Sequence, residues 1–264
     1  MKLSFIGAGN LAWHLAMAFE NAGNFICEVY SRDEKNARRL VSMLYDARIN
    51  PDLNFAESES ELFVLAIPDD AIEDVAAQLV LPENALVVHT SGSKSLDILR
   101  RLMDIYSDVP VRTGVFYPLQ TFSKGTTALH FEAIPLCIEA SDQETETQLV
   151  ALGQELSKIV YLVNSHERKV LHVAAVFACN FTNYLLGIAK DLTDTENLEF
   201  DLLKPLIEVT FQKALDARHP ALVQTGPARR GDVNTLSLHL AYLSDKPSLL
   251  QLYRMLSDGI QQRS

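Results

Sequence analysis

The 264-residue sequence contains few cysteines and shows none of the close cysteine spacings typical of disulfide frameworks or zinc sites. Cys27, Cys137 and Cys179 are far apart and form no C-x-x-C pair. We therefore expect buried, reduced thiols, and we predict no metal site. Reduced cysteines are typical of cytoplasmic proteins, so we predict a cytoplasmic location.

Positive charge is also scarce. The chain has 23 Lys and Arg residues against 34 Asp and Glu residues, a formal net charge of −11. This balance argues against a general nucleic-acid binder, although one arginine-lined pocket would still suffice to bind a small anion.

Long uninterrupted apolar runs are missing as well. The apolar run before Gly7 is shorter than the apolar region of a secretory signal, and the longest apolar stretch, residues 170–186, is interrupted by His172, Asn180, Thr182 and Asn183. We expect neither a membrane nor a nucleic acid as partner.

A glycine pair follows the first apolar run. Residues 7–12 read Gly-Ala-Gly-Asn-Leu-Ala and match the dinucleotide fingerprint G-x-G-x-x-G/A between a strand and a helix. Glycine lets the backbone approach a pyrophosphate, and the first helical amides then point at the anion. We predict that Gly7, Gly9, Asn10 and Leu11 bind a dinucleotide.

The end of the next predicted strand, residues 25–30, indicates which dinucleotide. NAD-specific folds usually carry an acidic residue at this position, whereas this chain has Ser31 and Arg32. A hydroxyl and a guanidinium suit a 2′-phosphate, which favours NADP(H). The alternative is that Arg32 is a solvated turn residue.

Alternating strand and helix patterns up to Val163 predict a doubly wound α/β Rossmann domain. Ligands of such sheets bind beyond the carboxyl ends of the strands. Ile67 and Pro68 end one predicted strand and Ser91 follows another, so we expect all three near the cofactor, with a backbone contact from Ser91 and Gly92 near the nicotinamide. An aspartate directly after Pro68 can cap the next helix. His89 faces either the core or the crevice, and Tyr117 is a further strand-end aromatic.

The pattern changes after Val163, where only helical periodicity follows. We predict a Rossmann domain over residues 1–163 and an all-α domain for substrate binding and dimerisation over residues 164–264. Asn164 and Glu167 have capping-box spacing and start a long helix. On a regular helix His172, Val176, Cys179 and Asn183 fall on one stripe with Asn180 on its flank, and the polar residues either line a wet pocket or are satisfied core groups. A fixed loop over residues 225–232 presents Arg230, either to a substrate anion or to solvent, and Asp232 can cap the next helix.

These residues support a resemblance to a family. The chain resembles Rossmann-like NADP oxidoreductases whose helical C-terminal domain is like that of 6-phosphogluconate dehydrogenase. The resemblance is carried by residues 7–12, 89–93, 117–122, 172–181 and 225–232 with 239–240. More distantly the chain is similar to pyrroline-5-carboxylate reductase and the β-hydroxyacid dehydrogenases.

The resemblance implies the fold and NADP but not a substrate. The hydroxyacid enzymes have a K-x-x-x-N motif with an acid or base lysine, and the residue four before Asn180 is Val176. The close family often has histidine where this chain has Tyr117.

We predict an NADP(H)-dependent oxidoreductase that moves a hydride to or from a small, anionic carbonyl or imine compound. His172 is the predicted proton donor, Asn180 orients the substrate and Arg230 holds its charge. The alternatives are a non-catalytic NADP-binding sensor or scaffold and an imine reductase of the proline type. The apolar helix around residues 170–186 predicts a homodimer through the helical domain.

Overall fold

The computed structural model describes residues 1–123 and 129–263. By its internal contacts the chain divides into two compact units, Met1–Phe181 and Thr182–Ser264. This division falls inside the long helix that starts after Asn164, later than the predicted domain boundary at residues 163/164. Each unit is described by itself.

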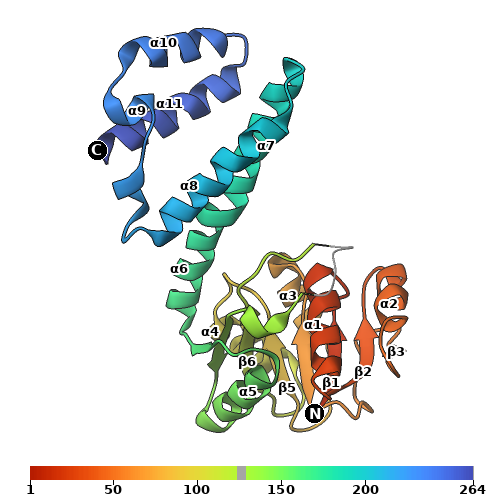
Figure 1. Ribbon diagram of the computed structural model, residues 1–264. Coiled ribbons are helices and arrows are strands. Elements are labelled where there is room, and N and C mark those ends of the chain that lie inside the picture. Colours follow the sequence, from red (N-terminus) through yellow and green to blue (C-terminus); the bar gives the residue numbers. More distant parts are fainter. Residues whose placement is uncertain (124–128, 264) are drawn as a thin grey trace. The chain divides into compact units, whose positions relative to one another are not determined.

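The described part of unit 1 is built on one eight-stranded sheet with strand order β3-β2-β1-β4-β5-β6-β7-β8 (Figure 1). This arrangement confirms the predicted Rossmann-type sheet. The strands are β1 (Lys2–Ile6), β2 (Phe25–Tyr30), β3 (Arg48–Ile49), β4 (Leu62–Leu65), β5 (Leu86–His89), β6 (Arg112–Pro118), β7 (Leu136–Ala140) and β8 (Val160–Leu162).

The strand direction reverses at β7. The strands from β3 to β6 run parallel, β7 is antiparallel to β6, and β8 is parallel to β7. A parallel neighbour requires a crossover connection, usually a helix. The described residues between β6 and β7 contain only the 3-10 turn η2 (Phe131–Ala133). The antiparallel direction of β7 is consistent with a connection whose described residues hold no crossover helix.

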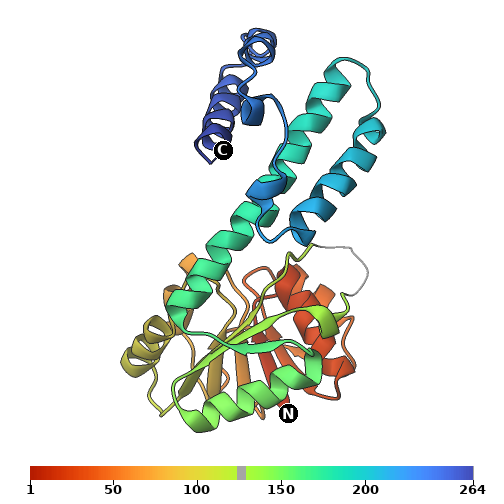
Figure 2. The ribbon, with the colours of Figure 1, turned by 60° about the vertical axis from the view of Figure 1, so that its left-hand side comes forward.

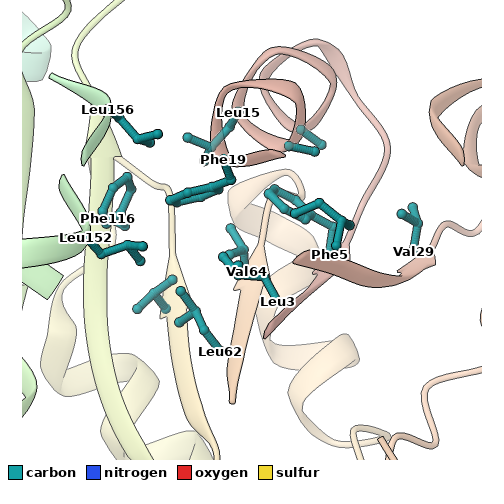
Figure 3. Close-up of a cluster of buried hydrophobic side chains, with 14 of the residues drawn as sticks. Leu3, Phe5, Leu15, Phe19, Val29, Leu62, Val64, Phe116, Leu152 and Leu156 are labelled. Carbon is teal, nitrogen blue, oxygen red and sulfur yellow. The ribbon is translucent and has the colours of Figure 1, made fainter. Parts of the chain in front are cut away.

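Helices cover both faces of the sheet (Figure 2). One apolar cluster combines the sheet with α1 (Asn10–Asn21), α2 (Glu34–Val41) and α5 (Gln143–Leu156). Figure 3 shows its centre, where Phe19 contacts Phe5 and Phe116 at ring distances of 6.3 and 5.4 Å. A second cluster joins the opposite face to α3 (Ile72–Ala76), which follows the 3-10 turn η1 (Asp69–Ala71), and to α4 (Leu96–Tyr106).

A continuous helical segment follows β8. It consists of α6 (Ser165–Ala175), the π-helix η3 (Val176–Phe181) and α7 (Thr182–Thr195). The predicted capping box is confirmed, because the Asn164 side chain accepts from the Glu167 amide and the Glu167 side chain accepts from the Asn164 amide. The predicted stripe assumes that the whole segment is a regular α-helix. This assumption is wrong beyond Val176, because a π-turn holds more residues than an α-turn and rotates the later side chains to a different face.

This 31-residue helix, Ser165–Thr195, is by length and composition able to cross a membrane. A single such helix is weak evidence for a membrane span, since helices of soluble proteins pass the same test. Its first turns are tied into unit 1 by the buried side chain of Arg168.

Unit 2 contains α7, α8 (Lys204–Asp216), α9 (Pro227–Arg230), α10 (Val233–Tyr242) and α11 (Pro247–Gln262), with the 3-10 turns η4 (Phe200–Leu203) and η5 (Pro220–Val223). The loop predicted over residues 225–232 instead holds the short helix α9, flanked by Gly226 at φ +105 and Gly231 at φ +64. Asp232 caps α10, as predicted.

The helices of unit 2 expose most of their apolar side chains. Among its described residues only Ala228 and Leu243 count as buried hydrophobics, whereas Leu202, Leu215, Leu222, Val233 and Leu238 are each at least 70% exposed. This is more exposed apolar surface than soluble monomers usually present.

Candidate functional site

The glycine loop connects β1 to α1 and lies at the carboxyl edge of the parallel strands. Gly7 has φ +110, and a Cβ there would lie 2.2 Å from the Ala66 carbonyl oxygen, so only glycine fits. At Gly9 a Cβ would meet nothing within 4 Å, which leaves open space beside the backbone. Gly9 is also the N-cap of α1 and provides no side-chain cap. Open space and uncapped helical amides are what a bound pyrophosphate requires.

The predicted 2′-phosphate residues follow β2 beside this loop. The Gly7 amide donates to the Tyr30 carbonyl over 2.8 Å, which brings the strand end to the glycine loop. Ser31 is half-buried and Arg32 is exposed. A pocket of 160 Å³ adjoins the same loop and is lined by Ala8, Gly9, Trp13, Asn36, Arg39, Leu40 and Met43.

The α2 side of this pocket was missed by sequence reasoning. Asn36, Arg39 and Leu40 recur at spacings of three and four, which puts them on one face of α2, and Met43 follows just beyond the end of the helix. That spacing was readable in the sequence, but nothing in the sequence indicated that this face of α2 meets Trp13.

The loop after β4 behaves differently from the prediction. An aspartate after Pro68 was expected to cap the next helix, yet α3 has no side-chain cap. The Asp69 carboxylate instead accepts a hydrogen bond from the Ser93 hydroxyl. The loops after β4 and β5 are thereby joined, because their carboxyl ends lie side by side in the parallel sheet.

Asn10 and His14 hold a more distant segment against α1. The Asn10 side-chain amide donates to the Phe122 carbonyl over 3.0 Å, and His14 Nε2 lies 3.1 Å from the Ser123 carbonyl. The side chain of Asn10 is therefore occupied within the protein. The predicted contact of Asn10 with the cofactor uses its backbone amide, and the hydrogen bond to Phe122 does not involve that amide.

Tyr117 and His172 meet at the same edge of the sheet. The Tyr117 hydroxyl lies 3.0 Å from His172 Nδ1, and the two rings are nearly perpendicular at 76°. Burial raises the pKa of Tyr117 to about 12, so the phenol stays protonated near neutral pH. Tyr117 lies at the end of β6 and His172 near the end of α6.

Gly92 makes the position of His172 possible. A Cβ at Gly92 would lie 2.6 Å from His172 Nδ1 and 2.7 Å from its Cγ, too close for any side chain. The loop after β5 thus presents bare backbone to the imidazole. Gly92 was predicted to lie near the nicotinamide, but its contact with the helix could not be read from the sequence.

Ser91 anchors this loop. Its hydroxyl accepts from the amides of Ser93 and Lys94 over 3.1 and 2.9 Å, and its carbonyl accepts from Arg168 Nε over 3.2 Å. The side chain therefore stabilises the turn. The predicted contact of Ser91 with the cofactor stays a prediction, as does that of Ile67 and Pro68.

Arg168 is the functional-site residue that sequence reasoning missed. Its side chain is fully buried and forms an ion pair with Glu139. It also donates to the Lys94 carbonyl over 2.5 Å and to the Ser165 hydroxyl over 3.3 Å. The only signal was its position four residues before His172, which puts both on one face of α6.

His89 is buried, which resolves the two alternatives left by the sequence. It is 1% exposed, and its Nδ1 accepts from the Ser91 amide over 3.1 Å. Burial, and then the positive charge of Arg168, lower the pKa of His89 to about 4. The imidazole is neutral at pH 7 and serves the packing of the loop after β5.

The other predicted residues lie on exposed surface. Asn180 is exposed within the π-helix η3, and Arg230 is exposed at the end of α9 in unit 2. The expectation of buried cysteines is wrong for Cys179, which is also exposed in the π-helix, whereas Cys137 is buried. The apolar spacing around Cys179 is typical of a core helix, but this part of the helix has no buried residue.

The fold and the glycine loop define a Rossmann-type dinucleotide-binding protein. Residues 2–92 match a family described as NADP oxidoreductase, coenzyme F420-dependent, and residues 134–260 match a domain of unknown function, DUF2520. A crystal structure of a "putative NADP oxidoreductase" from Bacteroides fragilis is 40% identical and superposes with a TM-score of 0.88. The alignment covers 99% of this chain and 98% of that one. The chain therefore belongs to this family of NADP oxidoreductases.

More distant relatives share the fold or part of the chain. A reductive aminase from Aspergillus terreus, in complex with NADPH and ethyl levulinate, has 17% identity and a TM-score of 0.70 over 99% of this chain and 94% of that one. Glycerol-3-phosphate dehydrogenase [NAD(P)+] from Thermoanaerobacter is 26% identical over 132 residues, which is 43% of this chain. The chain spans about two fifths of the length of that dehydrogenase.

The lowered pKa of His89 predicts a pH dependence of stability. The ordinary pKa of histidine is 6.5, so on acidification the unfolded chain takes up a proton before native His89 does. The free energy of unfolding should therefore fall between pH 6.5 and pH 4, with a His89 contribution of roughly 3 kcal/mol. Urea unfolding of wild type and His89→Gln at several pH values measures this contribution.

For each protein, the free energy of unfolding at lower pH is subtracted from its value at pH 7.5. Any pH-independent cost of the substitution cancels in this difference. His89→Gln should lose less stability than wild type over this range. Equal losses in the two proteins would contradict the assignment of this proton uptake to His89.

Proposed function

We propose that the protein is an NADP(H)-dependent oxidoreductase that transfers a hydride to or from a small, anionic carbonyl or imine compound, with His172 as proton donor. The observation that carries this proposal is the hydrogen-bonded Tyr117–His172 pair at the carboxyl edge of the sheet, over Gly92. Ligands of doubly wound sheets bind at this edge. A proton donor at that position completes the reduction of a carbonyl or imine group.

The cofactor fits the glycine loop. Gly7 permits the sharp turn, Gly9 leaves space for the pyrophosphate, and the amides of Asn10 and Leu11 point toward it. Ser31 and Arg32 would hold the 2′-phosphate, with Arg39 as a further cation beside the neighbouring pocket. Ile67, Pro68 and Ser91 would flank the nicotinamide end. When bound, NADPH supplies the hydride.

His172 is suited to proton transfer by its hydrogen bond. In the tautomer that carries its ring proton on Nε2, Nδ1 accepts from the protonated Tyr117 hydroxyl. When His172 is protonated, Nδ1–H can donate to the phenol oxygen instead, and the bond persists. Tyr117 therefore keeps the ring oriented in both states, and Nε2 is the nitrogen that would face a substrate.

Asn180 and Arg230 are the proposed substrate-binding residues. Asn180 offers an exposed amide on a π-helix, a feature frequent at functional sites. Arg230 offers an exposed guanidinium at the end of α9, directly before Gly231, and a guanidinium binds carboxylate or phosphate through paired donors. Both roles favour an anionic substrate.

One observation favours a second function. The lysine that acts as acid or base in hydroxyacid dehydrogenases is absent, because Val176 stands four residues before Asn180. A protein that binds NADP without turnover, as a sensor or scaffold, would have no need for that lysine. An imine substrate would also depend less on it, since an iminium ion accepts hydride directly.

Turnover distinguishes these functions. We expect NADPH, mixed with the protein and a panel of 2-oxoacids and cyclic imines, to lose its absorbance with at least one of them, or NADP+ to be reduced and gain absorbance with a hydroxyacid. With that substrate, His172→Ala should reduce kcat by roughly 10²- to 10⁴-fold. Tyr117→Phe should reduce it by about 10-fold, the value of one hydrogen bond.

The exposed His166, also on α6, provides the matched control, and His166→Ala should keep wild-type turnover. Full activity of His172→Ala would refute the assignment of the proton donor. A protein that binds NADPH but turns over none of the tested compounds would favour the sensor.

Cofactor choice is tested at Arg32. Removing a guanidinium that pairs with a 2′-phosphate costs about 1.5–3 kcal/mol, so Arg32→Ala should weaken NADPH binding roughly 10- to 100-fold. NADH lacks this phosphate, and its affinity should not change. Fluorescence titration of both nucleotides gives the two dissociation constants. Unchanged NADPH affinity in Arg32→Ala would leave Arg32 as a solvated turn residue.

We also propose a cytoplasmic homodimer formed through the helical unit. Gly187 lies in the middle of α7, where glycine costs about 1 kcal/mol relative to alanine, and a Cβ there would meet nothing within 4 Å. Two surface grooves, of 390 and 530 Å³, both include Asn183 and Gly187. A bare backbone between two grooves fits the close approach of a helix from a second copy.

Sedimentation of Gly187 variants tests the dimer. Wild type should sediment as a dimer at micromolar concentration, and Gly187→Leu should weaken association at least about 10-fold by overpacking, which costs about 1–3 kcal/mol. Gly187→Ala, a much smaller change, serves as the control and should remain dimeric. A monomeric wild-type protein would overturn the proposal.

A further inference from the structure

We infer that Arg168 is a positioning residue for His172: its guanidinium fixes α6 against the loop after β5, so that the imidazole lies over Gly92 within reach of Tyr117. The role rests on the proposed function, in which His172 donates the proton. It adds a residue that does not touch the reacting atoms but determines where the proton donor lies.

The first argument is the spacing of three residues on α6. Ser165, Arg168 and His172 lie at positions i, i+3 and i+7 and share one face of the helix. Each contacts the same short stretch. The Ser165 hydroxyl accepts from the Leu96 amide over 3.0 Å, Arg168 donates to the carbonyls of residues 91 and 94, and His172 covers Gly92. The helix is thus aligned along the loop by three successive contacts.

The second argument is the planar fork of donors on Arg168. Nε donates to the Ser91 carbonyl, Nη2 to the Lys94 carbonyl and Nη1 to the Glu139 carboxylate. These acceptors lie on the β5 loop and on β7, so one side chain fixes α6 against two separate segments. A lysine has its donors on a single nitrogen and cannot reproduce this geometry.

The third argument is burial. The Arg168 side chain is 0% exposed and that of Glu139 is 18% exposed, so this ion pair is shielded from solvent. Glu139 also accepts from the Ser165 amide and hydroxyl over 2.8–3.0 Å. A buried charge held by this many partners has a single geometry, because any displacement leaves a charge or carbonyl unpaired.

The fourth argument is how little freedom His172 has. It must approach Gly92 closely enough to exclude a Cβ, and it must also stay within 3.0 Å of the Tyr117 hydroxyl. A catalytic group has to be held within about 0.5 Å of its productive position. The contacts that hold this stretch of α6 against the loop after β5 are those of Ser165 and Arg168, on the same face as His172.

The test is the hydrogen bond at His172 Nδ1, observed by NMR of protein labelled with ¹⁵N-histidine. Spectra are recorded above pH 8, without cofactor or substrate, and His172→Gln identifies the resonance. Tyr117→Phe defines the Nδ1 shift that reports loss of the bond. Arg168→Met combined with Glu139→Gln removes both charges together and so leaves no unpaired buried charge to unfold the protein.

We expect the double variant to melt cooperatively and its Nδ1 resonance to move to the Tyr117→Phe position. Arg168→Lys keeps the charge but lacks the fork, and it should show the same shift even if the double variant does not fold. The exposed ion pair Lys158–Glu132 provides the control, and its removal by Lys158→Met with Glu132→Gln should leave the resonance at the wild-type position.

A wild-type Nδ1 resonance in folded Arg168→Lys, or in the folded double variant, would overturn the positioning role. This outcome is independent of turnover. Failure of the proposed function would appear in NADPH oxidation, whereas the NMR experiment reports only whether Arg168 determines the place of His172.

Discussion

The buried ion pair between Arg168 and Glu139 is the interaction on which the geometry of the candidate site depends. Placing a guanidinium out of contact with water is costly, and this cost is offset only when nearly every donor finds an acceptor. Here the acceptors are two backbone carbonyls, a carboxylate and a hydroxyl. Because they belong to the β5 loop, β7 and α6, satisfying one side chain fixes three segments relative to one another.

The reversal of β7 makes this arrangement possible. Glu139 pairs with Val115 in the antiparallel register, whereas Tyr117 pairs with Cys137. β8 runs parallel to β7, so α6 begins near the level of Glu139 and then runs back toward the carboxyl edge. Seven residues of helix advance about 10 Å, enough to bring the imidazole from the level of Ser165 to the end of β6. With β7 and β8 parallel to the other strands, α6 would start at the carboxyl edge and lead His172 away from it.

Much of the fold could be predicted because it depends on local patterns. The buried strand β4, the helix α5 and the capping box at Asn164 follow from hydrophobic period and capping chemistry. The direction of β7 was not predicted, because an apolar strand has the same pattern in either direction and only the kind of connection before it indicates the reversal. The same holds for the π-helix, since Val176 to Phe181 fit a regular helix equally well.

The candidate site, like the fold, could be predicted only where a local pattern defines it. The glycine loop has its own backbone requirement, visible at Gly7. His172 stood out as a polar residue in an apolar helix, but its partner Tyr117 lies 55 residues earlier. Arg168 follows charged residues at the start of α6, where an arginine is usually solvated. Only the tertiary structure shows that its side chain is buried and that the neighbouring charges are not.

Burial also limits which group at this edge exchanges protons. His89 has its pKa lowered to about 4 and Tyr117 has its pKa raised to about 12, so both are neutral across the range in which an imidazole ordinarily titrates. Burial dominates both shifts, and the charge of Arg168 enhances the first and opposes the second. The third residue, His172, is the proposed proton donor. The buried arginine thus acts on the site twice, through the position of His172 and through the neutral state of His89.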